Sequence, residues 1–286
     1  MSDETPLFDG GIAPAWATEW GRDRRGAFVS FRVGAVTHRL RWIPPGRFWM
    51  GSPEGEEGRW EGEGPRHEVE LTRGYWLGET SVTQALWEAV TGQTPSYFKG
   101  AERPVEHVSW HDCITFLDQL NERVRGLDAR LPTEAEWERA CRGGTDGPTW
   151  LGANDEGNLD SIAWYGANSG GETHDVRGKA ANPYGLYDML GNVLEWCSDL
   201  YGPYETALVR DPVGAANGSF RVRRGGGWRW TAGGARASGR DGYDPSSRGR
   251  ALGFRLARDN SLLSAPSADS RIGEEREAGS GPRPRR

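Results

Sequence analysis

Alternating apolar and polar residues near the start of the chain predict a β-hairpin. Residues Phe28–Val33 and His38–Ile43 each alternate with a period of two, and Gly34 lies where the turn between them is expected. Pro44–Gly46 then interrupts the pattern. Short strands are also expected over Arg47–Met50, His67–Leu71, Tyr75–Leu77, Arg221–Gly227 and Gly253–Arg258.

Three segments instead show the spacing of amphipathic helices. The first is Thr83–Val90, whose leading threonine can cap the helix and which is followed by Gly92 as a stop signal. The second is Asp112–Arg125, which carries an apolar stripe. The third begins after Thr133, which forms a capping box with Glu136, and a glycine pair ends it.

The remaining segments divide the chain into one domain with two polar ends. Residues 1–25 are polar with scattered apolar positions, and we expect a flexible arm there. The domain should span residues 26–258, and a Ser, Pro, Gly and charge-rich stretch over 259–286 is typical of a disordered tail. Inside the domain, residues 53–64 form an acidic loop, and little regular structure is expected over 144–182.

Composition narrows the fold class. The chain has 286 residues, of which 42 are glycine and 14 are tryptophan. Glycine inside a helix costs roughly 1 kcal/mol relative to alanine, so a protein of long helices is excluded. No apolar run approaches the roughly 20 residues that span a bilayer, so we expect no membrane contact. The composition favours short elements, tight turns and large pockets filled by rings.

Charge and cysteine content exclude other classes. The net charge of −6 argues against a nucleic-acid partner. The three cysteines, Cys113, Cys141 and Cys197, are odd in number and widely spaced, so neither a disulfide framework nor a zinc knuckle is expected. The first residues lack the features of a signal peptide, and the expected location is therefore the cytoplasm.

Seven motifs in order resemble the formylglycine-generating-enzyme-like, or sulfatase-modifying-factor, family. They are Ile43–Gly46 with Met50–Ser52, Glu79–Thr83, Pro104-Val105 with Val108–Trp110, Leu131–Trp137, Tyr184–Trp196, Arg224–Gly226 and Leu252–Arg255. Together they run from about residue 40 to residue 258. The resemblance implies an α+β domain with the variant C-type-lectin fold of that family and little regular secondary structure.

The resemblance also implies a calcium site within Asp188–Glu195. Calcium prefers six to eight oxygen ligands, mixing carboxylates and carbonyls. Asp188 and Glu195 can supply carboxylates, and Gly191 and Val193 lie where the family donates backbone carbonyls. The alternative is a surface turn in which Asp188 only caps backbone amides.

A second calcium site of the family is matched less closely. It uses an asparagine followed by an apolar residue, and Asn158-Leu159 fits that pair. The acidic position falls near Asn168, with Gly170 as the carbonyl donor. The spacing is shorter than in the family, and asparagine is a weaker ligand than aspartate.

The catalytic chemistry of the family has no counterpart in the sequence. Members that oxidise a substrate cysteine to formylglycine carry a cysteine pair just after the Arg-Gly-Gly motif, and those thiolates bind copper(I). Residues Gly227–Arg240 contain no cysteine. The three upstream cysteines are expected to be small buried apolar side chains.

A basic segment near the end of the domain is the candidate binding surface. Ten arginines lie between Arg221 and Arg258, against two aspartates. Arginine combined with tryptophan and tyrosine is typical of binding hot spots. The expected ligand-binding residues are Trp228, Arg229, Trp230, Arg236, Arg240, Tyr243, Arg248 and Arg250. The alternative is that these arginines form salt bridges to the acidic loop at 54–63.

Three functions remain open. The first is a non-catalytic, calcium-stabilised module that binds a protein or peptide through Trp228–Arg250. A special case is a retroelement-diversified variable protein, because such proteins vary close to the same C-terminal Gly-Phe-Arg motif. The second is a metal-dependent oxidoreductase of this family that uses a different metal set. The third is a scaffold or effector subunit of a signalling or defence system.

Overall fold

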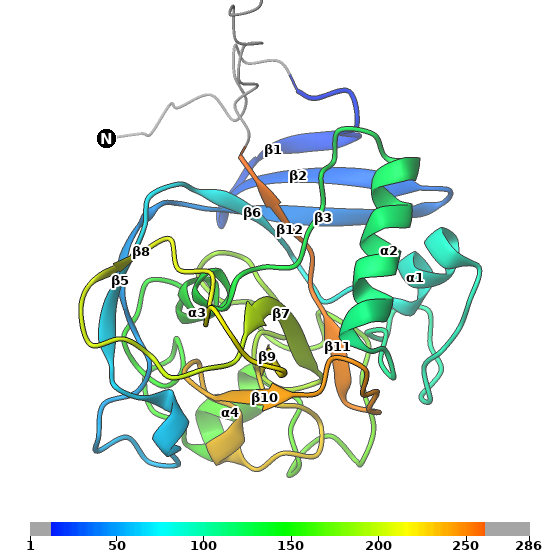
Figure 1. Ribbon diagram of the computed structural model, residues 1–286. Helices are drawn as coiled ribbons and strands as arrows, with labels where there is room; N and C mark the ends of the chain where they lie inside the picture. The colour runs from blue at the N-terminus through cyan, green and yellow to red at the C-terminus, as the bar shows by residue number, and fades with distance from the viewer. Residues whose placement is uncertain (1–12, 261–286) are drawn as a thin grey trace, which may run out of the picture.

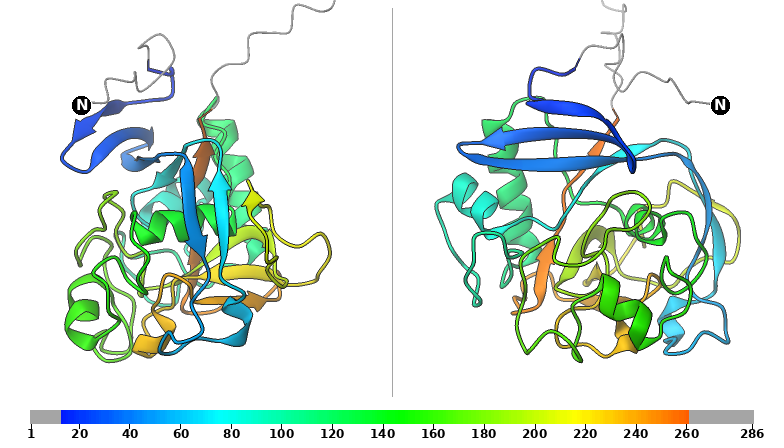
Figure 2. Two further views of the ribbon diagram at one scale, coloured as in Figure 1. Left: turned by 90° about the vertical axis from the view of Figure 1, so that its left-hand side faces the viewer. Right: turned by 180° about the vertical axis from the view of Figure 1, so that it is seen from behind.

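The computed structural model describes residues 13–260, which form three β-sheets and four α-helices (Figure 1). The largest sheet has the strand order β1-β2-β3-β6-β12, and its first three strands cross one end of the molecule (Figures 1 and 2). Its strands are β1 (Glu19–Asp23), β2 (Gly26–Val33), β3 (Val36–Ile43), β6 (Tyr75–Gly78) and β12 (Ala257–Asp259).

Two smaller sheets and the helices complete the domain. One sheet has the order β10-β9-β7-β11 and the other β4-β5-β8. Their strands are β4 (Gly46–Met50), β5 (His67–Leu71), β7 (Leu194–Leu200), β8 (Val209–Arg210), β9 (Arg221–Arg224), β10 (Arg240–Tyr243) and β11 (Leu252–Phe254). The helices are α1 (Gln84–Thr91), α2 (Trp110–Arg123), α3 (Glu134–Arg142) and α4 (Glu156–Ile162), with 3₁₀ turns η2 (Glu61–Glu63) and η3 (Ala232–Gly234). This is the expected α+β class.

The predicted hairpin is confirmed as β2 and β3. The two strands pair antiparallel, with Phe28 opposite Arg41 and Val33 opposite Val36. Gly34 lies in the turn with φ of +58°, a left-handed conformation that glycine adopts without steric cost.

The helix boundaries follow the capping residues in the sequence. Thr83 accepts a hydrogen bond from the Leu86 amide at the start of α1, and Gly92 ends the helix in the left-handed conformation. Thr133 and Glu136 form the predicted capping box of α3. Helix α2 starts two residues earlier than expected, because the residue before it forms a capping box of its own.

The expectation of a flexible arm over residues 1–25 is wrong for part of that segment. Residues 19–23 form β1, which pairs antiparallel with β2 along its whole length, and Trp16 is buried. Most side chains of β1 are exposed, so its sequence lacks the alternation of apolar and polar residues that would predict a strand. Backbone pairing with β2 holds the segment at the edge of the sheet. Residues 1–12 and 261–286 lie outside the described part of the chain.

Large rings fill the interior, as the composition predicts. Trp76, Trp137 and Trp196 are almost fully buried, and the Trp87 ring stacks on Phe116 with 5.0 Å between centroids. Residues 144–182 contain one short helix, α4, and are otherwise irregular, as expected. Within residues 13–260 we find no helix with the length and apolar character needed to cross a membrane.

Candidate functional site

Two arginines expected on the binding surface are buried instead. Arg236 forms ion pairs with Glu56, at 2.6 Å, and with Glu63, so the alternative of pairing with the acidic loop is correct for this residue. The guanidinium of Arg240 donates to both carboxylate oxygens of Glu134 at 2.7 and 2.8 Å. The expectation that Arg236 and Arg240 bind a ligand is therefore wrong, because folding places carboxylates from distant segments beside them.

The same buried network extends through the centre of the domain. Glu138 is fully buried between Arg142, whose Nη2 lies 2.6 Å from a carboxylate oxygen, and Arg224. Burial alone raises the pKa of Glu138, but the two guanidinium groups hold that pKa below its usual range. These charges are paired with one another in the interior and are not accessible to a ligand.

Arg248 and Tyr243 lie nearer the surface but already have partners. Arg248 donates to both carboxylate oxygens of Asp112 at 2.7 and 2.8 Å, with its side chain half exposed. The Tyr243 ring is covered by the guanidinium of Arg223 at 3.9 Å and packs near Trp196. The Arg248 charge is therefore paired, and one face of the Tyr243 ring is covered by Arg223.

The remaining expected residues are exposed or half-buried, and two of them, Trp228 and Arg250, contact two further aromatic residues. We define this arginine–aromatic face by Tyr97, Phe98, Trp228, Arg229, Trp230 and Arg250. The Arg250 guanidinium lies 3.6 Å from the centre of the Tyr97 ring, and Phe98 meets Trp228 edge to face at 5.4 Å. Trp228 also donates its indole N–H to the Arg250 carbonyl at 2.9 Å.

The two arginines of the face carry uncompensated charge. Arg229 and Arg250 are exposed, and neither forms an ion pair with any residue from 13 to 260. The Arg229 guanidinium lies 4.7 Å above the Trp230 ring, so both charges rest on aromatic surfaces.

Sequence reasoning missed Tyr97 and Phe98. They lie in a short loop between Pro95 and Gly100, and Tyr97 is 55% exposed. Two adjacent aromatic residues in an otherwise polar loop were the one feature of the sequence that could have indicated a binding surface here. Their proximity to Trp228, about 130 residues later, arises only in the folded chain.

A buried carboxyl group lies beneath this face. Glu106 is inaccessible to solvent; one carboxylate oxygen accepts the Phe98 amide at 2.9 Å, and the other has no hydrogen-bond partner among residues 13–260. Burial raises the pKa of Glu106 to about 7, despite the opposing effects of nearby amides and the charges of Lys99 and Arg250.

Stability should fall as the pH rises from 6 to 8. Burial also raises the pKa of Asp199 to about 7, so Glu106 and Asp199 bind protons in the folded state at pH values where the unfolded carboxyls are ionised. Ionisation of each carboxyl group should therefore lower the free energy of unfolding by about 1 kcal/mol between pH 6 and pH 8. The buried His38, with a pKa lowered to about 3 by burial, acts in the opposite sense and offsets part of this fall near pH 6, where the unfolded imidazole is still largely protonated.

Urea unfolding at pH 6, 7 and 8 measures this dependence. Glu106→Gln removes one of the two buried carboxyl groups whose pKa lies near 7 while keeping an oxygen that can accept the Phe98 amide, so it should flatten the pH dependence by about half. Asp188, whose pKa burial raises to about 6, adds a smaller fall near pH 6. A wild-type unfolding free energy that is constant or rises over this range would contradict the assignment.

The predicted calcium ligand Glu195 is already fully occupied. One of its oxygens accepts from the Ser81 hydroxyl at 2.7 Å and the other from the Trp137 indole at 2.7 Å. Arg255 donates to both oxygens, at 2.9 and 3.0 Å. The positive charge of Arg255 neutralises the carboxylate, and the four donors use its lone pairs.

The other three residues of the predicted calcium site provide few oxygen ligands. Asp188 accepts the Arg177 amide with one carboxylate oxygen, and its second oxygen is buried without a hydrogen-bond partner in the described chain. Gly191 and Val193 are buried and can contribute only backbone carbonyls. Glu195 is thus engaged by Arg255, whereas Asp188 keeps one buried oxygen without a partner in the described chain, and the calcium site stays a prediction.

The second predicted set is also engaged in local hydrogen bonds. Asn158 lies in α4 and donates to the Asp155 carboxylate at 3.0 Å, while the Asn168 oxygen accepts the Tyr165 amide at 2.9 Å. Leu159 is buried in α4, and Gly170 is exposed. Across residues 13–260, no group of three or more His, Cys, Asp or Glu side chains is arranged to hold a metal ion.

The three cysteines are buried and have no disulfide partner. Burial raises the pKa of the Cys113, Cys141 and Cys197 thiols, to about 12 for Cys141. A thiolate is the nucleophilic and metal-binding form, so these side chains are chemically inert near neutral pH.

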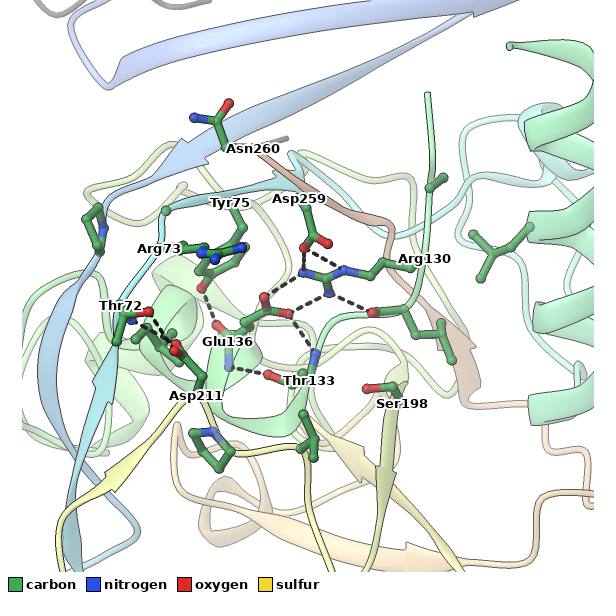
Figure 3. A pocket seen from close by; sticks show the side chains of 18 of the residues that line it. Thr72, Arg73, Tyr75, Arg130, Thr133, Glu136, Ser198, Asp211, Asp259 and Asn260 are labelled. Atoms are coloured by element: carbon green, nitrogen blue, oxygen red, sulfur yellow. Dashed lines mark hydrogen bonds and ion pairs between the residues drawn. The ribbon is translucent and has the colours of Figure 1, made fainter. Parts of the chain in front are cut away.

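A groove of about 1370 Å³ opens on another part of the surface (Figure 3). Several of its polar side chains bond to one another: Arg130 pairs with Glu136 at 2.7 Å and with Asp259, and the Thr72 hydroxyl donates to Asp211 at 2.6 Å. None of the residues expected to bind a metal or ligand lines this groove.

Comparisons with known proteins agree with the fold and the motifs. The Sulfatase-modifying factor enzyme 1-like domain matches residues 32–260. The chain is 30% identical to the formylglycine-generating enzyme of Streptomyces coelicolor, over 79% of this chain and 91% of that protein. It is 34% identical to the inactive C-alpha-formylglycine-generating enzyme 2 of Bos taurus, over 64% of this chain and 58% of that protein.

A solved structure shows the same architecture. Treponema denticola variable protein 1 superposes with a TM-score of 0.74 at 35% identity, over 81% of this chain and 99% of that chain. The expected variant C-type-lectin fold is thus confirmed. On the matched domain, the seven motifs and this likeness, the chain belongs to the sulfatase-modifying factor family.

Proposed function

We propose that this chain is a non-catalytic member of the family that binds a protein or peptide ligand through the arginine–aromatic face. The observation that carries the proposal is the pair Arg229 and Arg250, which are exposed, unpaired within residues 13–260 and supported by aromatic rings. Arginine, tryptophan and tyrosine are the residue types most enriched in binding hot spots.

Three observations support a non-catalytic role. Gly227–Arg240 lacks the cysteine pair expected of the oxidases, and the cysteines elsewhere are buried. One relative, 34% identical, is itself an inactive formylglycine-generating enzyme. The purified protein, incubated with copper and a cysteine-containing peptide, should therefore form no aldehyde detectable by mass spectrometry, whereas formation of formylglycine would restore the oxidase alternative.

The binding role is tested by comparing three forms of the protein as bait. Partners captured by the wild type should be lost with the Arg229→Ala/Trp230→Ala double variant, because it removes one unpaired charge and its supporting ring. Arg248→Ala is the matched control, since Arg248 lies in the same segment but pairs with Asp112. Retention of every partner by the double variant would show that the face is not the binding surface.

The diversified-protein alternative is favoured by the likeness to Treponema denticola variable protein 1. It requires a near-repeat of the DNA encoding residues 228–250, beside a reverse-transcriptase gene and with differences confined to adenines. The neighbouring genomic sequence decides this point. Without such a repeat, the face is a fixed binding surface.

A further inference from the structure

We propose that the ligand of the arginine–aromatic face is an acidic peptide segment, whose carboxylates bind Arg229 and Arg250 while its side chains pack on Tyr97 and Trp228. The inference rests on the binding function proposed above and adds the chemistry of the partner. Its basis is the placement of the free charges, the rigidity of their supports and the charge balance around them.

Both guanidinium groups are stacked on aromatic rings in the absence of a ligand. Arg250 lies 3.6 Å above the Tyr97 ring, and its own carbonyl accepts the Trp228 indole N–H, so both its backbone and its side chain are held. Arg229 rests on Trp230 in the same manner. An ordered guanidinium loses little entropy when it binds, and its planar donors match a carboxylate.

The surroundings leave this face positive on an otherwise acidic protein. Lys99, next to Phe98, donates only to the Thr94 carbonyl and has no ion pair within residues 13–260. Neighbouring Arg103 and Glu172 neutralise each other at 2.9 Å. The protein as a whole carries −6, so a local cluster of unpaired cations favours a partner with acidic groups.

The carboxyl group beneath the face does not satisfy these cations. Glu106 is buried, and its bonded oxygen accepts the Phe98 amide rather than a guanidinium. Its pKa is raised to about 7, which reduces its negative charge at neutral pH. The charges of Arg229 and Arg250 are therefore available to an incoming carboxylate.

Nucleic acid fits this face less well than a peptide does. Binding a nucleic-acid backbone relies on many phosphate contacts along a positive track. The face offers Arg229, Arg250 and Lys99 within a chain of net charge −6, which is enough for a few carboxylates. An oligonucleotide is accordingly included as a competing ligand in the test.

Fluorescence anisotropy with labelled probes tests the inference on the full chain. The probes are a short glutamate-rich peptide containing tyrosine, the same peptide with lysine in place of every glutamate, and a short oligothymidylate. We expect the acidic peptide to bind, with affinity falling as salt increases. Arg250→Ala and Arg229→Ala should each weaken it by roughly 10- to 100-fold, the loss of one charged hydrogen-bonding group.

Arg248→Ala is the control variant, and three outcomes would contradict the inference. Arg248→Ala should leave the affinity unchanged, because Arg248 is already bonded to Asp112. Equal binding of the lysine peptide, tighter binding of the oligonucleotide, or full affinity in both arginine variants would overturn the inference. If no acidic peptide binds while the Arg229→Ala/Trp230→Ala variant still loses its captured partners, the proposed function stands and only the acidic chemistry is wrong.

Discussion

Replacing Glu138 with alanine should lower the free energy of unfolding by about 3–5 kcal/mol. Glu138 is the fully buried carboxylate between Arg142 and Arg224, and it also accepts the Gly51 amide at 2.9 Å. Without it, both guanidinium groups stay in the interior without their shared counter-charge. The cost of two uncompensated buried charges exceeds that of the empty volume left by the side chain.

Urea unfolding at neutral pH measures this effect. The control is Glu68→Gln, which removes a pair with Arg47 at 3.7 Å between partly exposed side chains and should cost no more than about 1 kcal/mol. A Glu138→Ala protein as stable as the control would show that water or local rearrangement compensates the arginines. The buried network would then contribute less to stability than its geometry indicates.

Gly191→Ala should destabilise the protein by roughly 2–5 kcal/mol, of which about 1–2 come from the left-handed backbone and about 1–3 from overpacking. Gly191 has φ of +79°, and an added methyl carbon would lie 2.8 Å from the Trp164 carbonyl carbon and closer still to its oxygen. The Asn192 amide donates to that same oxygen at 2.7 Å, so the two segments cannot separate without losing a buried hydrogen bond.

Gly170→Ala separates the two causes. Gly170 has φ of +63°, but an added methyl group there meets no atom within 4 Å. The control should therefore cost about 1–2 kcal/mol, the backbone contribution alone. Equal losses in the two variants would mean that the close approach to Trp164 is relieved by a small backbone shift, and thermal unfolding of both proteins distinguishes these results.

The local elements followed from the sequence because their determinants are adjacent in the chain. Thr83, Gly92, Thr133 and Glu136 act within one or two helical turns, so their residue types and spacing suffice to place the helix ends. Strand β7 was missed, because residues 194–200 are buried on both faces for most of their length and show no alternation.

The proposed binding face could be predicted only in part. Trp228, Arg229, Trp230 and Arg250 were recognised from their composition, but the same composition also selected Arg236, which is buried. Whether an arginine binds a ligand or stabilises the core depends on which carboxylates lie beside it, and those carboxylates come from distant segments.

The sequence by itself determined the family, the fold class and the lack of cysteine between residues 227 and 240, because each depends on residue types in a fixed order. Only the tertiary structure decided which charges are free. It paired Arg236 with the acidic loop, occupied Glu195 with Arg255, and left Arg250 exposed on the Tyr97 ring. The energy of a charge depends on its burial and its nearest neighbours, and folding brings those neighbours from segments far apart in the chain.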